Sequence, residues 1–434
     1  MAVSMTPPLA KAPSQIRALA FYLPQYHPIA ENDEWWGPGF TEWRNVTKAK
    51  PLFRGHYQPH LPADLGFYDL RLPEAREAQA SMARSHGLHG FCYYHYWFNG
   101  RRVLETPFEA VLASGQPDFP FCLCWANENW TRVWDGGEKE ILLQQDYDFD
   151  DDLRHIESLI PAFRDKRYIR IDGKPIFLVY RTGIMPDPER TARLWRTAAQ
   201  NAGLPGIYLI RVESHGDTKD PRSLAFDASV EFAPFNGLRW EVVPRGPLRT
   251  LLSRLGLLPA GITRHAVYDY GQMATEMENR EHPGFKRFRC ATPSWDNTAR
   301  RQINGTILVD STPERYETWL RRIATRTRED FTGDERLCFI NAWNEWAEGN
   351  HLEPDLKFGA AYLQATDRAL AAPLANGSVQ SVELPIEGKL APDHRGSVNY
   401  LMKRRYWALL EKLKNSSVAR SLKYLRTPWG RTEQ

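Results

Sequence analysis

The chain has 434 residues, of which 42% are hydrophobic and 25% are charged, so it can bury a large core and is not mainly disordered. Its 56 basic and 53 acidic side chains leave a net charge of only +3, which argues against nucleic acid as a partner. This length fits two or three ordinary domains, or one α/β barrel with insertions.

Short apolar runs bounded by proline, glycine or charged residues predict buried strands. These runs are residues 17–26, 87–98, 120–128, 175–181, 206–213, 228–233, 288–293 and 337–346. Segments between them carry helical spacing, for example 153–163 and a stretch opened by Pro188 and closed near Gly203. No Gly-x-Gly-x-x-Gly follows the first run, and eight βα units close most economically into a parallel barrel. We predict a (β/α)8 TIM-type barrel over residues 15–372.

Two insertions are expected over the barrel mouth, because each follows a predicted strand. Residues 27–72 are rich in tryptophan, tyrosine and histidine, and residues 234–266 are rich in arginine and leucine. Enzymes of this architecture build their sites from the loops that follow the strands. The insertions are therefore candidates to line a site.

The tail, residues 373–434, differs from the rest of the chain. Between 401 and 434 it has nine basic and two acidic residues, and its apolar residues are spaced to suit one or two amphipathic helices. Two interpretations stay open. The helices pack on the barrel and expose their charge, or they make a peripheral contact with an anionic inner membrane surface.

The cysteines and the N-terminal residues favour a cytoplasmic protein. Residues 1–14 contain no apolar run long enough for an export signal, and no later segment approaches the ~18 apolar residues of a membrane-spanning helix. The five cysteines are odd in number and lie inside apolar runs, so we expect reduced core thiols. Cys122, Cys124 and His95 could begin a zinc site, but no second Cys/His pair has the required spacing. We expect no metal and no cofactor.

Residues 341–355 contain the densest set of polar groups, directly after the last apolar run. Glu345 and Glu348 are three apart, so in a turn or the first coil of a helix their side chains become neighbours. Glycoside cleavage requires such a pair, one acid to protonate the departing oxygen and one base or nucleophile. The alternative is that both glutamates cap a helix or form surface ion pairs.

Aromatic residues make up 12% of the chain, with 15 Trp, 18 Tyr and 20 Phe. Sugar rings pack their C–H faces on such side chains, whose N–H and O–H groups supply hydrogen bonds beside them. Simple filling of a large core explains the same composition, and both interpretations stay open.

Several stretches together resemble a known family. Residues 345–349 (EWAEG) resemble the catalytic Glu-Trp-x-Glu-Gly segment of glycoside hydrolase family 99, and the whole chain is similar to the related WbsX-like family found with polysaccharide biosynthesis genes. Further matching stretches are residues 21–27 (FYLPQYH), 39–43 (GFTEW), 93–97 (YYHYW), 125–130 (WANENW) and 295–297 (WDN). The resemblance implies that Glu345 is a base on the sugar 2-hydroxyl and that Glu348 is the general acid/base of a retaining reaction.

Sugar-binding groups are expected among the aromatic, amide, histidine and acidic side chains at the strand exits, some of which must face the mouth. Our candidates are Tyr22, Gln25, His27, Trp43, Tyr94, His95, Trp125, Asn127, Glu128, Glu231, Trp295, Asp296, Trp343 and Asn344. The alternative for these residues is hydrogen bonding within the core.

The acidic run Asp146, Asp148, Asp150 and Glu157 allows two further interpretations. It matches the ligand spacing of a calcium loop, but Asp151 stands where that loop needs glycine. It also contains the Asp-x-Asp pattern typical of many glycosyltransferases. The helical spacing from Leu153 onward favours a third explanation, acidic residues at the N-terminus of a helix.

Three functions remain in competition. The leading hypothesis is a retaining, endo-acting glycoside hydrolase on a bacterial surface polysaccharide or lipid-linked glycan. The second is a glycosyltransferase of O-antigen or polysaccharide biosynthesis. The third is a glycan-binding barrel without turnover, which the paired glutamates argue against.

Overall fold

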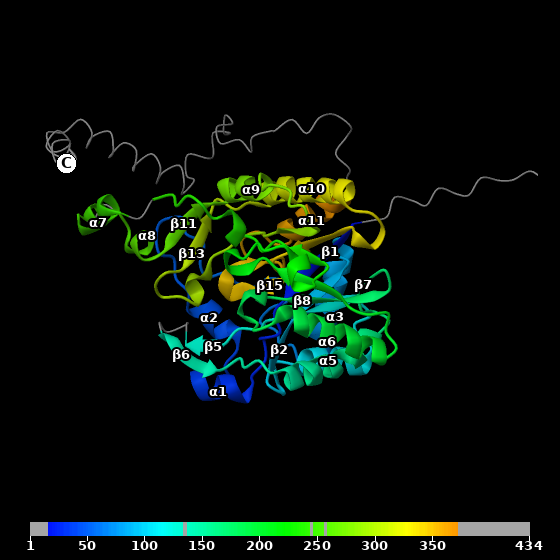
Figure 1. Cartoon of the computed structure of the whole chain (residues 1–434). Helices are drawn as coiled ribbons and strands as arrows, with labels where there is room; N and C mark the ends of the chain where they lie inside the picture. The colour runs from blue at the N-terminus through cyan, green and yellow to red at the C-terminus, as the bar shows by residue number, and fades with distance from the viewer. Residues whose placement is uncertain (1–15, 133–136, 244–245, 256–257, 372–434) are drawn as a thin grey trace, which may run out of the picture.

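The computed structural model describes residues 16–132, 137–243, 246–255 and 258–371. Within these residues, eight parallel strands pair side by side and the first pairs with the last, which closes a (β/α)8 barrel (Figure 1). The barrel strands are β1 (Arg17–Tyr22), β2 (Gly90–Phe98), β4 (Phe121–Trp125), β8 (Lys174–Val179), β9 (Tyr208–Val212), β10 (Ala228–Val230), β12 (Arg287–Ala291) and β14 (Leu337–Ile340). Each falls on one of the predicted apolar runs, and the predicted fold class is confirmed.

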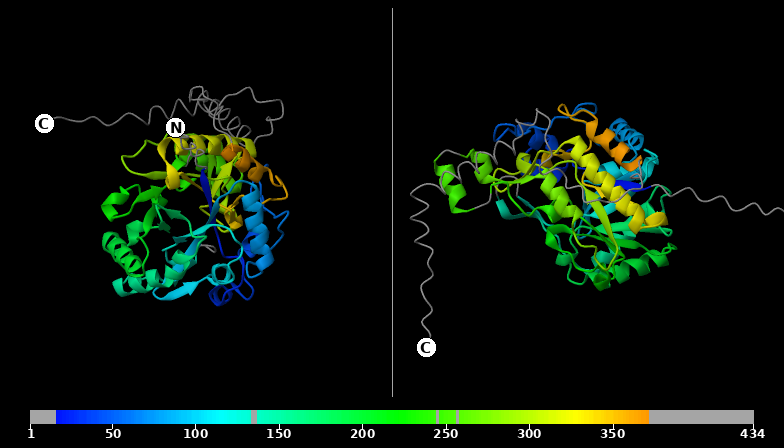
Figure 2. Two further views of the ribbon diagram at one scale, coloured as in Figure 1. Left: turned by 90° about the vertical axis from the view of Figure 1, so that its right-hand side faces the viewer. Right: turned by 90° about the horizontal axis from the view of Figure 1, so that it is seen from above.

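Helices surround the strands (Figure 2). They are α3 (Pro73–Ser85), α4 (Thr106–Ser114), α5 (Phe149–Arg164), α6 (Pro188–Asn201), α9 (Tyr270–Glu278), α10 (Pro313–Asp330) and α11 (Ala361–Ala371). Between β9 and β10 the chain forms only the 3-10 turns η3 (Ser214–Gly216) and η4 (Pro221–Leu224), because glycine and proline interrupt this connection. The barrel therefore lacks an α-helix at this one connection among those described.

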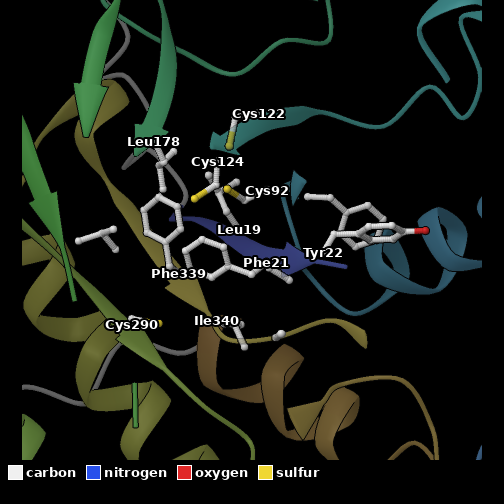
Figure 3. Close-up of a cluster of buried hydrophobic side chains, with 14 of the residues drawn as sticks. Leu19, Phe21, Tyr22, Cys92, Cys122, Cys124, Leu178, Cys290, Phe339 and Ile340 are labelled. Carbon is white, nitrogen blue, oxygen red and sulfur yellow. The ribbon is translucent and has the colours of Figure 1, made fainter. Parts of the chain in front are cut away.

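Side chains alternate between the barrel interior and the helices, as the pleat of a strand requires. The Phe21 ring packs against the rings of Tyr94, Phe232 and Phe339, which come from three other parts of the barrel wall. Figure 3 shows Phe21 beside Phe339. The next residue, Tyr22, points the other way, and its hydroxyl donates to Gln79 Oε1 of α3 at 2.6 Å. All five cysteines are buried and free, as expected of reduced core thiols.

The two insertions form small structures beside the strand ends. Residues 27–72 contain α1 (Ala30–Trp36) and α2 (Glu42–Lys48), and residues 234–266 contain η5 (Phe235–Gly237), α7 (Pro247–Arg254) and α8 (Ala260–Arg264). A second apolar cluster joins these insertions to the parallel pair β11 (Ala266–Asp269) and β13 (Thr306–Val309). Its buried members are Phe53, Val242, Val243, Ile262, Val267, Ile307 and Val309.

Shorter elements complete the described chain. The hairpin β5 (Trp130–Arg132) and β6 (Gly137–Leu143) lies near α1 and α2 in Figure 1. The others are β3 (Arg101–Val103), β7 (Arg170–Ile171), β15 (Asn344–Glu345), β16 (Asn350–His351), η2 (Thr182–Ile184), η6 (Asn297–Ala299), η7 (Gly333–Glu335) and η8 (Trp346–Glu348).

The acidic run begins a helix, as one of its three interpretations predicted. Asp148 is the N-cap of α5, and its side chain accepts a hydrogen bond from the Asp150 backbone N–H. The predicted tail, 373–434, lies outside the described residues. Among the helices that are described, none combines the length and the apolar character that a membrane crossing requires.

The packing of the barrel predicts that Gly90→Ala destabilises the protein. A Cβ at Gly90, which begins β2, would lie 2.5 Å from the Pro120 carbonyl oxygen and 2.9 Å from Ile169 Cδ1. We expect the free energy of unfolding to fall by about 1–3 kcal/mol, as for other overpacked sites. Urea denaturation measures the change, with Gly284→Ala as control because nothing lies within 4 Å of its added Cβ. Equal stability of the two variants would contradict the prediction.

Candidate active site

The loop after β14 is fixed to the segment after β1 by one side-chain amide. Asn344 Oδ1 accepts from the Leu23 backbone N–H at 2.7 Å, and Asn344 Nδ2 donates to the Leu23 carbonyl at 3.0 Å. The Trp343 backbone N–H donates to the Phe21 carbonyl at 2.8 Å. These buried contacts set the position of the residues that follow.

Glu345 and Glu348 face the same guanidinium. They stand at the start and end of a 3-10 turn, in which residues three apart share a face. Arg300 Nη2 lies 2.9 Å from Glu345 Oε2, and Arg300 Nη1 lies 2.8 Å from Glu348 Oε1. The two carboxylates are therefore neighbours, as the sequence predicts.

A third carboxylate joins this cluster. Glu42, fully buried on α2, places Oε2 3.0 Å from Arg300 Nε. Three acidic groups thus surround one guanidinium at the meeting point of α2, η6 and η8. We call Glu42, Arg300, Glu345 and Glu348 the carboxylate cluster.

Burial changes the ionisation of the cluster. Loss of water raises the pKa of Glu345 to about 8, against the opposing effect of Arg300 and with a contribution from Glu348. Burial also raises the pKa of Glu348, again opposed by Arg300. Two carboxyl groups that share a cation titrate as a pair. Around neutral pH this pair retains a proton, which is the state that acid/base chemistry needs.

The carboxylate cluster opens onto a cavity of about 490 Å³, which Glu345, Glu348 and Arg300 help to line. Four of the predicted sugar-binding residues line the same cavity: Gln25, Tyr94, Glu128 and Trp295. Much of the remaining wall is aromatic, formed by Trp35, Trp36, Tyr96, Trp130, Tyr180 and Phe235. Glu128 pairs with Arg181 Nη1 at 2.7 Å. The cavity combines stacking surfaces with paired acids, a combination suited to sugar rings.

The sequence matches a family model described as Glycosyltransferase WbsX over residues 18–366. The chain belongs to this WbsX family. It is also 43% identical over 352 residues to proteins called "Uncharacterized protein WxcX" from two strains of Xanthomonas campestris pv. campestris. The alignment covers 81% of this chain and 49% of each relative, so the chain spans about half the length of these curated relatives.

Solved structures similar to this WbsX-family chain share its fold at low sequence identity. A "Glycoside hydrolase-like protein" superposes with a TM-score of 0.52 at 14% identity, over 85% of this chain and 97% of the other. The GH99 endo-alpha-mannosidase from Bacteroides thetaiotaomicron superposes with a TM-score of 0.51 at 14% identity, over 82% and 96%. This likeness shows the fold, which agrees with the barrel that the sequence predicts.

The other predicted sugar-binding residues of this WbsX-family chain do not line the cavity. They are Tyr22, His27, Trp43, His95, Trp125, Asn127, Glu231, Asp296, Trp343 and Asn344. All are buried, and most bond to other protein groups. For example, Asn127 bonds both the N–H and the C=O of Arg181, at 2.8 and 2.9 Å, and His95 Nε2 lies 2.9 Å from His155 Nε2. These side chains therefore make contacts within the protein, and one of them, Asp296, lines a second cavity.

Glu231 shows why a strand exit alone does not place a group in the mouth. Its carboxylate lies 3.1 Å from Arg280 Nη1, and the same guanidinium binds Glu213 at 2.6 Å. Burial raises the pKa of Glu231, and the charges of three arginines, including Arg287 at 3.5 Å, oppose this rise only in part. The group therefore belongs to a buried ion-pair network and does not line the cavity.

Sequence reasoning missed Arg300 and Glu42 as members of the site. Glu42 lies inside residues 39–43, one of the stretches that carried the family resemblance, and Arg300 closely follows residues 295–297. Residues 39–43 and 295–297 were therefore the sequence signal that could have pointed to Glu42 and Arg300. Their meeting at one point depends on the folding of α2 and η6 against η8.

Replacing Arg300 with methionine should destabilise the protein most at high pH. The variant leaves buried carboxylates unpaired, a change that typically costs about 3–5 kcal/mol. A carboxyl whose pKa is higher in the folded state destabilises the fold once the pH exceeds its unfolded value, and protonation removes that penalty. Because burial already raises the pKa of Glu345 to about 8 and loss of Arg300 raises it further, the deficit should be larger at pH 8 than at pH 5.

Urea denaturation of Arg300→Met at both pH values measures the effect. Arg193→Met is the control, because Arg193 and Glu189 form an ion pair whose side chains are 71% and 50% exposed. Its effect should stay within about 1 kcal/mol. A loss in Arg300→Met that does not depend on pH would refute the argument.

Proposed function

We propose that this protein is a retaining glycoside hydrolase that acts on a polysaccharide or a lipid-linked glycan, with Glu345 as base on the sugar 2-hydroxyl and Glu348 as general acid/base. The single observation that carries the proposal is the position of two neighbouring carboxylates, the buried Glu345 and the partly buried Glu348, on the wall of one aromatic cavity. The roles of the two residues follow the resemblance to the GH99 segment.

The cluster provides the groups that cleavage needs. A general acid must keep a proton near neutral pH, and burial supplies this by raising the pKa of both glutamates. Arg300 holds the two side chains in place and offsets part of their mutual repulsion. Such positioning matters because small displacements of reacting groups reduce rates strongly.

The assignment of acid and base places a requirement on substrate binding. The cluster by itself gives Glu345 a pKa of about 8, while the proposed reaction needs the proton on Glu348. A sugar whose 2-hydroxyl donates to Glu345 stabilises that carboxylate in its charged form, because hydrogen bonds to an anion lower its pKa. Binding of the sugar then moves the shared proton to Glu348.

A glycosyltransferase is the second candidate, favoured by the description of the family that the sequence matches. The same carboxylate pair serves it if a sugar hydroxyl, rather than water, attacks the activated sugar. Product analysis with and without an acceptor sugar separates the two reactions. A glycan-binding barrel without turnover, the third candidate, predicts binding and no product under either condition.

The two glutamates should differ in their response to the leaving group. Glu345→Gln and Glu348→Gln should each reduce turnover of a natural glycan by about 10²–10⁴-fold or more. With an aryl glycoside that carries a good leaving group, Glu348→Gln should recover most of its rate, because the departing oxygen no longer needs a proton. Glu345→Gln should not recover.

The control for this comparison is Glu278→Gln. Glu278 pairs with Arg322 on the outer helices and is not among the residues that line the cavity. The variant should retain the activity of the unmodified protein. If the aryl glycoside rescued only Glu345→Gln, Glu345 would be the general acid and Glu348 the base. Full activity of either variant would show that the replaced glutamate is not catalytic.

A second expectation concerns stereochemistry. If Glu345 acts through the 2-hydroxyl, the first product keeps the anomeric configuration and a 2-deoxy substrate is not cleaved. Proton NMR of the early product measures the first point, and a rate comparison measures the second. An inverted product would instead place the base farther from the acid, with Glu128 as the candidate, since among the described residues it is the other acidic group that lines the cavity.

A further inference from the structure

A second cavity, of about 260 Å³, lies beside the first and shares Trp295 with it. Three buried side chains on its wall are spaced as metal ligands: His60, His351 and Asp355. His60 comes from the insertion after β1, whereas His351 and Asp355 follow the turn that carries Glu345 and Glu348. One donor atom of each residue lies within 4.8 Å of the donor atoms of the other two.

The individual distances are close to those of a metal site. His60 Nδ1 lies 2.9 Å from His351 Nε2, and His351 Nε2 lies 3.8 Å from Asp355 Oδ2. Two ligands bound to one zinc ion at ~2.0–2.1 Å stand roughly 3.3 Å apart. Small rotations of the side chains would bring all three atoms to a common ion.

The surroundings orient the ligand atoms as a metal requires. His351 Nδ1 lies 2.8 Å from the Glu353 carbonyl, which only accepts, so Nδ1 carries the hydrogen and Nε2 presents a lone pair. Metal-binding histidines commonly donate their second nitrogen to a carbonyl in this way. Asp355 Oδ1 accepts from the backbone N–H groups of Lys357 and Phe358, at 2.9 and 2.6 Å, and leaves Oδ2 toward His351.

We propose that His60, His351 and Asp355 form a site for a divalent transition metal of the zinc type, with its open positions toward the second cavity. Two neutral imidazoles and one carboxylate give the site a net negative charge, and this donor set suits borderline metals.

The metal would fix the turn that carries the paired glutamates. The Trp346 ring stacks on the His351 ring, with centroids 3.7 Å apart and an interplanar angle of 15°. Trp346 lies between Glu345 and Glu348, and its Nε1 donates to Glu353 at 2.6 Å. An ion that joins His60 to His351 therefore ties the insertion after β1 to this turn.

A plain hydrogen bond between His60 and His351 is the competing explanation, and the chain contains a matched control for it. His95 and His155 are also buried with their nitrogens 2.9 Å apart. Within the described residues, no carboxylate completes a metal-binding group with them. The pair His60 and His351 therefore has a carboxylate as a possible third ligand, whereas the pair His95 and His155 has none among the described residues.

The test uses full-length protein without an affinity tag, stripped with chelator and then dialysed against limiting Zn²⁺. Elemental analysis should find one zinc per chain in the unmodified protein and in His155→Gln. His60→Ala and Asp355→Asn should bind at least ~100-fold more weakly, since each lacks a ligand. Zinc should raise the Tm of the first two proteins and leave the other two unchanged.

A measurement on the unmodified protein covers the case in which a variant does not fold. X-ray absorption of the Co²⁺-loaded protein should show two imidazole ligands and one or more oxygen ligands. Absence of bound metal in the unmodified protein, a cobalt shell without imidazole, or equal zinc content in folded His60→Ala would overturn the proposal. None of these readouts depends on glycan cleavage, so the outcome is independent of the proposed function.

Discussion

The site depends on the contact between Arg300 and three carboxylates, of which Glu42 and Glu345 are buried and Glu348 is partly buried. Burial alone lowers the pKa of a guanidinium, but Glu42, Glu345 and Glu348 outweigh that effect and raise the pKa of Arg300. The guanidinium has a planar set of donors, so it fixes the direction of each carboxylate as well as offsetting charge. Since Glu42 comes from α2, Glu345 from β15 and Glu348 from η8, this contact also attaches the first insertion to the segment that follows the last barrel strand.

A second buried network supports the same turn from behind. Glu353 accepts hydrogen bonds from Trp346 Nε1, Gln79 Nε2 and Tyr68 OH at 2.6, 2.7 and 2.8 Å. Burial raises the pKa of Glu353 to about 7, while these donors lower it. Together with the clamp of Asn344 on Leu23, this network leaves the turn few alternative positions. Rigid support of this kind is what a pair of reacting carboxylates requires.

The similar solved structures and the matching family carry different descriptions. The structural neighbours include a mannosidase of family GH99, whereas the matching family is described as a glycosyltransferase. Hydrolysis and transfer share the step that breaks the glycosidic bond, and they differ in the molecule that attacks afterwards. The two functions proposed for the paired acids therefore differ in the second step, in which water or a sugar hydroxyl attacks. The chain spans about half the length of its curated relatives, so these statements concern the barrel described here.

The sequence by itself determined the barrel, because eight apolar runs separated by helical or turn segments leave one economical closed arrangement. It also determined the proximity of Glu345 and Glu348, since three residues of spacing in a tight turn place both side chains on one face. Only the tertiary structure decided which other groups join them. Arg300 and Glu42 are distant in sequence, and their contact depends on how loops pack at the mouth. Likewise, the direction of a side chain at a strand exit separates Glu128 in the cavity from Glu231 in an ion-pair network, because alternate residues of a strand face opposite sides and irregular loops break that alternation.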